Sequence, residues 1–448
     1  MTGGKSVDML HGPLLGKILI FALPLAASSI LQQLFNSVDV AVVGRFASSE
    51  ALAAVGSNAP VISLLVNLFL GLSMGANVVI SNHIGQNDQA GIRKAISTVC
   101  VIALTCGVFL LFLGVAAARP ILEWMGTPDK VLDMAITYLR IYFLGMPFIM
   151  IYDFGAAILR SRGDTRRPLY ILIAAGIINT AFNLLFVICF GMGVAGVAVA
   201  TGIANAVSAA LILFILRKEP EPYRLHPRVM KVNWRELKRM VQIGIPAGLQ
   251  GVIFSISNVA VQSAINGYGA AAAAGSAAAL NFEFYCYYLV EAFNGAAISF
   301  IGQNYGAGNK ERVSRTFWLC LLFSVAGCAL MNFIFVWQDD FFLDFFSADP
   351  EVHVYGRMRL HYVLMWQAMI CSYEISGSSL RGMGYSLLPT IFTIVGTCLL
   401  RLVWVFVVSP RYPGFDVLMR VYPLSWVLTG TMVATAWAVI FRRWKRAA

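Results

Sequence analysis

Long apolar stretches dominate this chain, and its charged residues gather between them. Each stretch is at least as long as the roughly 20 residues that a helix needs to cross the hydrocarbon core of a bilayer. In lipid only helices and closed barrels satisfy their backbone groups, and these stretches are too long for barrel strands. We therefore predict an all-α polytopic membrane protein with twelve transmembrane helices, at residues 18–43, 52–80, 95–118, 133–158, 168–190, 194–216, 240–265, 279–301, 314–336, 356–380, 388–408 and 420–441.

The low charge content supports a membrane location. Charged residues make up only 12% of the chain and hydrophobic residues 59%, whereas about a quarter of a soluble domain is charged. The net charge is +11, but the basic residues lie between apolar spans. We expect them to face a membrane surface, so the lipid bilayer is a predicted partner and nucleic acid is not.

The basic residues also predict the orientation of the chain. They are concentrated in the two terminal segments and in every second segment between spans. By the positive-inside rule these segments, and so both termini, lie in the cytoplasm. The main members of this set are Lys5, Lys17, Arg93, Lys94, Arg160, Arg162, Arg166, Arg167, Lys310, Arg312, Arg315, Arg381, Arg442, Arg443, Lys445, Arg446 and the 217–239 segment with its Arg228. We interpret residues 217–239 as a basic cytoplasmic linker, with a short surface helix at 233–239. No removable signal peptide is expected at the N-terminus.

Signatures of enzymes and metal sites are missing from the sequence. The eight cysteines form no C-x-x-C pair, and no G-x-S-x-G, H-E-x-x-H or nucleotide P-loop motif occurs. We expect no enzymatic activity, no metal and no cofactor other than a transported ion.

The two halves of the chain repeat each other. Pro24 and Asn36 match Pro246 and Asn258 at an offset of 222, and the Leu-Arg pair ending at Arg160 recurs, ending at Arg381, at an offset of 221. The tetrapeptide Ile-Gly-Gln-Asn at 84–87 recurs at 301–304, an offset of 217. We predict two parallel-repeat six-helix lobes, residues 1–216 and 240–448, joined by the 217–239 linker. Transporters built from such repeats hold their substrate near the midplane and expose it alternately to each side.

Five motifs stand out along the chain: VDVAVVGR at 38–45, ALAAVG at 51–56, GLSMG at 71–75, Leu-Arg-x-x-Gly at 159–163 and GVAGVAVAT at 193–201. Together they resemble the motifs of one transporter family, the multidrug and toxic compound extrusion (MATE) family, and most closely its bacterial DinF-like branch. The resemblance implies a MATE/MOP-type fold with two lobes in a V. It also implies a monomer in the bacterial cytoplasmic membrane that expels organic cations or other amphipathic compounds in exchange for protons or sodium ions.

Asp39 is the strongest candidate for the coupling site. An ionisable group at the bilayer centre costs about 2.5–3.5 kcal/mol, so it is a functional candidate by default. Asn36, on the same face of the first span, is a second candidate for this site, and Gln32 shares that face. The resemblance implies that polar residues of spans five and six complete a cation site, which adds Asn179, Asn183 and Thr201. Asn183 stands where relatives often carry a second aspartate.

The second half offers a separate set of acids as candidates for substrate or proton binding. Glu283 and Glu291 lie in span eight, where Glu291 shares a face with Tyr287 and Asn294. Glu374 lies in span ten and matches Asp153 of the first half at the repeat offset of 221. Aromatic rings beside a carboxylate suit flat organic cations.

Three arginines complete this set of predictions. Arg401, inside span eleven, is expected to neutralise one of these acids, while Arg357 and Arg359 are expected to extend towards the membrane surface. A lipid-linked precursor or polysaccharide flippase is the alternative function. The physiological substrate and the choice between proton and sodium remain open at this stage.

Overall fold

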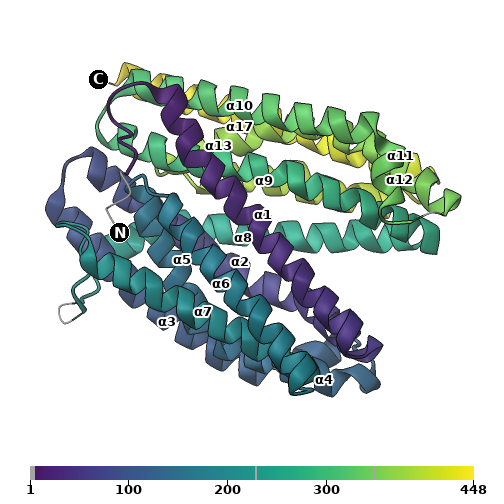
Figure 1. Cartoon of the computed structure of the whole chain (residues 1–448). Coiled ribbons are helices and arrows are strands. Elements are labelled where there is room, and N and C mark those ends of the chain that lie inside the picture. The colour runs from purple at the N-terminus through teal and green to yellow at the C-terminus, as the bar shows by residue number, and fades with distance from the viewer. Residues whose placement is uncertain (1–5, 228–229, 348, 448) are drawn as a thin grey trace. The chain divides into compact units, whose positions relative to one another are not determined.

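The computed structural model describes residues 6–227, 230–347 and 349–447, and every regular element in these ranges is a helix (Figure 1). Two basic residues used above, Lys5 and Arg228, lie outside the described residues. The helices of the first half are α1 (Leu14–Phe46), α2 (Ser49–Gly85), α3 (Gln89–Trp124), α4 (Asp129–Leu144), α5 (Met146–Ser161), α6 (Arg166–Leu184), η1 (Leu185–Cys189) and α7 (Gly193–Lys218).

The second half repeats this order with more interruptions. Its helices are α8 (Trp234–Asn266), α9 (Ala270–Gly306), α10 (Lys310–Trp337), α11 (Asp339–Asp344), α12 (Pro350–Tyr362), η3 (Leu364–Met369), α13 (Ile370–Gly382), α14 (Leu387–Thr393), η4 (Ile394–Leu399), α15 (Leu400–Val403), η5 (Trp404–Val408), α16 (Phe415–Met419) and α17 (Val421–Arg446). All twelve predicted spans fall on these helices. The 133–158 span is the pair α4 and α5, bent by 47°, and the 356–380 span runs through α12, η3 and α13.

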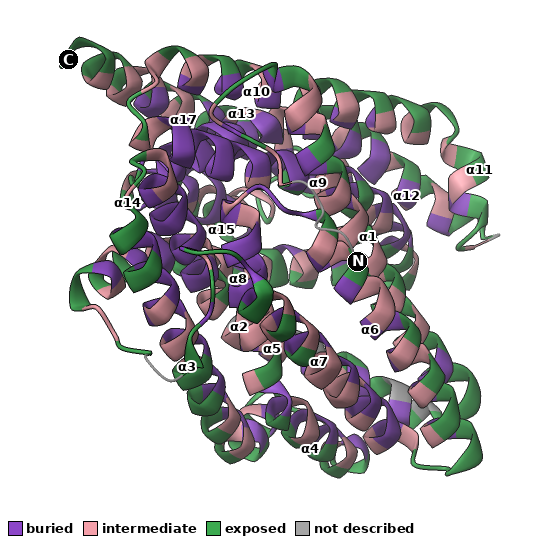
Figure 2. Cartoon of the chain, turned by 60° about the vertical axis from the view of Figure 1, so that its left-hand side comes forward, coloured by how far each residue is buried: buried purple, intermediate pink, exposed green. Residues whose placement is uncertain are grey.

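Within the described part of the chain, nine helices are long and apolar enough to cross a membrane, or ten when α4 and α5 count as one span. The two spans that fail this test are α9 and the α12–α13 segment. They carry Glu283, Glu291 and Glu374, so polarity is concentrated in the helices that hold the second-half candidates. α13 is also an interior helix, because 12 of its 13 residues are buried (Figure 2).

The chain folds into two compact units. Unit 1 comprises residues 1–8 and 23–248, and unit 2 comprises residues 9–22 and 249–448. The divisions fall inside α1 and α8, the two helices that begin the repeats. Each of these helices therefore contributes to both units, an arrangement that apolar periodicity does not predict.

Glycines bring α8 against α2 inside unit 1. A Cβ atom on Gly71 would lie 2.3 Å from the backbone nitrogen of Gly248, and one on Gly75 would lie 2.4 Å from the carbonyl oxygen of Met240. Gly244 and Gly248 repeat the same four-residue spacing on α8. Small residues at this spacing let two membrane helices approach until their backbones touch.

The ends of corresponding helices correct one of the sequence matches. α2 ends at Gly85 and α9 at Gly306, and the side chains of Asp88 and Asn309 cap the helices that follow, all at an offset of 221. The repeated tetrapeptide, at an offset of 217, is therefore about one helical turn out of register. The short surface helix expected at 233–239 was also wrong, because these residues lead directly into the long helix α8.

Candidate functional site

Four of the five first-half candidates lie together in unit 1. The Asn183 amide of α6 donates hydrogen bonds to Asp39 of α1 and, at 2.6 Å, to Oδ1 of Asn179. Asn179 donates to the Thr201 hydroxyl of α7 at 3.2 Å, and Thr201 donates to the Val197 carbonyl at 3.0 Å. A chain of hydrogen bonds thus runs from one carboxylate through two amides to a hydroxyl, across three helices.

Asn36, the fifth candidate, does not join this group. Its side chain is exposed, and no described residue forms a hydrogen bond with it. By contrast, Asn183 is fully buried, and its Oδ1 atom has no hydrogen-bond partner among the described residues. A buried amide oxygen without a donor, next to a carboxylate, is an oxygen-rich position that suits a proton or a hard cation.

The structure also brings four second-half candidates together in unit 2. The Tyr287 hydroxyl donates to Glu291 at 2.9 Å and lies 3.5 Å from Glu374, and the Asn294 amide lies 3.4 Å from Glu291 and 3.0 Å from Glu374. Glu374 is buried whereas Glu291 is exposed on the surface of its unit. Two carboxylates therefore share the same neutral donors.

Arg381 lies near this acidic cluster, although the sequence placed it in a cytoplasmic loop. It lies in the last turn of α13, is 5% exposed and donates to Oε1 of Gln250 at 2.7 Å. Its guanidinium folds back along the helix, since Nη1 lies 3.9 Å from the position of a Cβ atom on Gly377. Glu374 and Glu291 are its electrostatic neighbours.

A sequence signal for Arg381 did exist. Asp153 and Arg160 of the first half have the same seven-residue spacing as Glu374 and Arg381. The repeat therefore pairs an acid with an arginine, two helical turns further on, in both halves.

Glu283 is not part of the acidic cluster. It accepts two hydrogen bonds from Arg359, at 2.5 and 3.0 Å, and Arg359 also donates to the Ser276 hydroxyl at 2.6 Å. The side chains of Glu283 and Arg359 are 9% and 3% exposed. The expectation that Arg359 extends to the membrane surface was wrong, because the buried carboxylate one helix away holds it inside unit 2.

The prediction for Arg401 was also wrong. No acid among the described residues forms an ion pair with it. Its guanidinium lies 4.4 Å from the ring centroid of Tyr422 and 3.1 Å from Oδ1 of Asn258. At the repeat offsets Asn258 corresponds to Asn36 and Tyr422 to Thr201. Beside the counterpart of Thr201, unit 2 thus has a permanent cation on an aromatic face.

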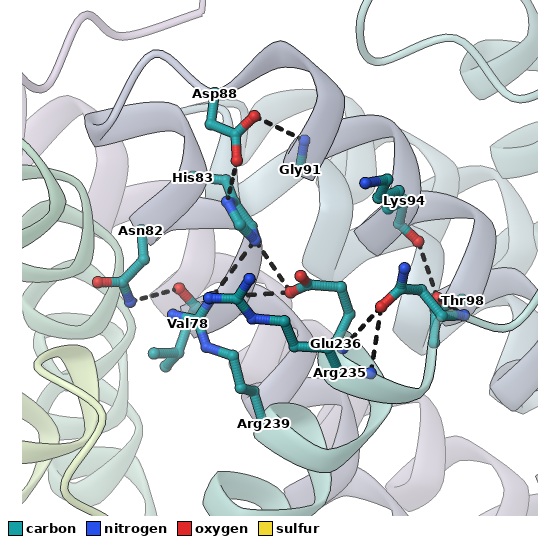
Figure 3. A network of polar contacts seen from close by, with 11 residues as sticks. Val78, Asn82, His83, Asp88, Gly91, Lys94, Thr98, Arg235, Glu236 and Arg239 are labelled. Atoms are coloured by element: carbon teal, nitrogen blue, oxygen red, sulfur yellow. Dashed lines mark hydrogen bonds and ion pairs between the residues drawn. The ribbon is translucent and has the colours of Figure 1, made fainter.

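A further charged network, which the sequence did not indicate, fastens α8 to α2 in unit 1 (Figure 3). His83 Nε2 lies 2.9 Å from Glu236 and 3.4 Å from Arg239, both of α8, and His83 Nδ1 lies 3.1 Å from Asp88. His83 and Glu236 are buried. The pKa of Asp88 lies below its ordinary value, first because its carboxylate accepts the Gly91 N–H and also because His83 lies beside it.

Unit 2 has a counterpart of the His83 network at the end of α9. At the offset of 221, Asn304 corresponds to His83, and its amide donates to the Met9 carbonyl at 3.1 Å. Arg312 adds hydrogen bonds to the carbonyls of Met9 and Gly12, at 3.0 and 2.9 Å. In unit 1 the end of α2 thus holds the first turns of α8, and in unit 2 the end of α9 holds the segment that leads into α1.

Comparisons with known proteins agree with this architecture. The MatE family model matches the chain twice, at residues 24–185 and 246–407. The relatives include the probable multidrug resistance protein YoeA of Bacillus subtilis, 28% identical over 84% of this chain and 82% of that protein. They also include the probable multidrug resistance protein NorM of Thermotoga maritima, 27% identical over 95% and 90%. The FAD transporter of Shewanella oneidensis is 25% identical over 71% of each chain.

Solved structures share the fold of the whole chain. A multidrug resistance MATE family transporter of the MOP superfamily in an outward-facing conformation has a TM-score of 0.91, with 20% identity and 100% coverage of both chains. A MATE structure in the straight conformation also has a TM-score of 0.91, with 20% identity and 99% coverage of both. Because the family model covers most of both halves, this chain is a member of the MATE family, a multi-pass membrane transporter rather than an enzyme.

Proposed function

We propose that this protein is a secondary active efflux transporter. It exports organic cations and other amphipathic small molecules across a bacterial cytoplasmic membrane by alternating access, in exchange for protons or sodium ions. It acts as a monomer with both termini in the cytoplasm. The observation that carries the proposal is the Asp39 carboxylate, within the long apolar helix α1, at the end of the Asn183–Asn179–Thr201 chain. Two relatives, one from Bacillus subtilis and one from Thermotoga maritima, are named as probable multidrug resistance proteins, and these names support the same substrate class.

The amide of Asn183 explains how the site could alternate between two states. When Asp39 is ionised, the amide donates an N–H to it. When Asp39 is protonated or holds a cation, the buried Oδ1 of Asn183, otherwise without a partner, supplies the complementary acceptor. Since this chain of hydrogen bonds contains one carboxylate, that of Asp39, binding of one proton or one sodium ion neutralises it.

The acidic cluster of unit 2 is assigned to the cationic substrate. Glu291 and Glu374 carry two negative charges when ionised, and Arg381 offsets one of them. The remaining negative charge, next to the ring of Tyr287, matches a monovalent organic cation. The acid–arginine spacing supports this role for Arg381 as a built-in counter-ion.

Dye efflux from inverted vesicles tests the proposal. We compare an imposed pH gradient with an imposed sodium gradient for the unchanged protein, for Asp39→Asn and for Asn36→Ala, which alters an exposed residue of the same helix outside the hydrogen-bond chain. Coupled efflux should be lost in Asp39→Asn at normal expression and be retained in Asn36→Ala. Normal efflux by Asp39→Asn would refute the coupling role.

The same assay addresses the alternative function. No response to either gradient would favour the lipid-linked precursor flippase. Because one relative is an FAD transporter, the substrate panel should include a dinucleotide beside the cationic dyes. Efflux of the dinucleotide alone would contradict the organic-cation assignment.

A further inference from the structure

A long open groove runs between α14 and α17 of unit 2. Its volume is about 940 Å³. Most of its lining is apolar, and the main contributors are Leu388 and Phe392 of α14 with Met432, Val439 and Ile440 of α17. Val439 is 43% exposed. This groove contains none of the candidate coupling or substrate residues.

The groove has one closed end. There, the Thr397 and Thr429 hydroxyls lie 2.8 Å apart, and a Cβ atom on Gly396 would lie 2.4 Å from the Thr429 hydroxyl. At this level η4, which continues α14, touches α17, while the α17 residues of the lining lie beyond it towards the C-terminus of α17.

The open end is basic and aromatic. Arg443, Tyr385 and Trp444 line it, and no described residue forms a hydrogen bond with the Tyr385 hydroxyl. The Trp444 ring is held by Tyr305, at 4.9 Å between centroids, and by Lys310, whose ammonium lies 5.8 Å from the ring. Aromatic and basic residues in this combination mark the headgroup level of a bilayer.

The length of the groove fits one leaflet. The lining of α17 extends from Thr431 to Trp444, which is about 20 Å along a helix. One leaflet with its headgroups is also about 20 Å thick. We propose that this groove is a binding site for one anionic phospholipid, with an acyl chain along the apolar lining and the phosphate at Arg443 and the Tyr385 hydroxyl. In the orientation proposed above, the lipid belongs to the cytoplasmic leaflet.

Native mass spectrometry of the purified full-length protein tests this site without measuring transport, so its result is independent of the proposed function. The probes are phosphatidylglycerol and phosphatidylcholine with identical acyl chains. The variants are Arg443→Gln with Arg442→Gln as its control, and Thr435→Trp with Ala434→Trp as its control. Arg443 and Thr435 line the groove, whereas Arg442 and Ala434 are their neighbours on α17 outside it.

We expect the unchanged protein to retain one phosphatidylglycerol more strongly than phosphatidylcholine. Arg443→Gln should weaken phosphatidylglycerol binding about fivefold, and Arg442→Gln should have little effect. Thr435→Trp should block both lipids by filling the groove, while Ala434→Trp should leave them bound. Equal effects of the two glutamine variants, equal retention of the two lipids, or full retention by Thr435→Trp in a protein of unchanged melting temperature would overturn the proposal.

Discussion

The buried pair of Glu283 and Arg359 supports a quantitative prediction. In Glu283→Gln, the Arg359 guanidinium keeps its charge inside unit 2 but loses the carboxylate that it contacts at 2.5 and 3.0 Å. At about 3 Å and an effective dielectric constant of about 20, the lost attraction is about 5.5 kcal/mol. Removal of one partner from a buried pair typically costs about 3–5 kcal/mol. Glu283→Gln should therefore lower the free energy of unfolding by about 3–5 kcal/mol.

A double variant separates the charge from the pairing. Glu283→Leu with Arg359→Met removes both charges and keeps apolar volume, so it should be close to neutral in stability. The assay is unfolding of the purified protein in detergent, followed by tryptophan fluorescence, with efflux measured in parallel. Since Glu283 contacts Arg359 and not the acidic cluster, the double variant should keep coupled efflux. A loss of stability in the double variant as large as in Glu283→Gln, or a loss of efflux at normal stability, would refute this reasoning.

Three further perturbations follow from the described contacts. His83→Ala deprives the buried carboxylate of Glu236 of its nearest partner and should speed hydrogen exchange in the first turns of α8, as measured by mass spectrometry; unchanged exchange would contradict the fastening role. Gly244→Leu should abolish folding, because its Cβ atom would lie 2.6 Å from the Leu72 backbone, and a normal gel-filtration profile would show that α8 does not approach α2 so closely. Glu374→Gln should reduce efflux of a cationic dye more than Glu291→Gln does, since Glu374 is the buried member of the cluster, and the reverse order would count against the substrate assignment.

The placement of ten of the twelve spans could be predicted from apolar length, because a bilayer imposes a minimum apolar length on a crossing helix; α9 and the α12–α13 segment are more polar and fail this criterion. The grouping of Asp39 with Asn179, Asn183 and Thr201 was implied by the family resemblance, and the structure places these four side chains in one chain of hydrogen bonds. The roles of these residues remain predictions.

The partners of the arginines could not be predicted. The expectation for Arg359 used only its distance from a helix end, which does not reveal a carboxylate on a neighbouring helix. Arg401 was matched to an acid by charge alone, yet the face of Tyr422 and the amide of Asn258 hold it. His83 gave no signal, because its partner Glu236 lies 153 residues further along the chain.

The sharing of α1 and α8 between units bears on how the chain is made. Unit 1 contains residues up to 248 and unit 2 reaches back to residue 9. A ribosome that has released only the first repeat has therefore not yet supplied the part of α8 that packs against Gly71 and Gly75. Conversely, the Met9 segment must wait for α9 to be synthesised. The two repeats are thus not independent folding modules. If they are expressed as two separate chains, each chain should need the other in order to fold.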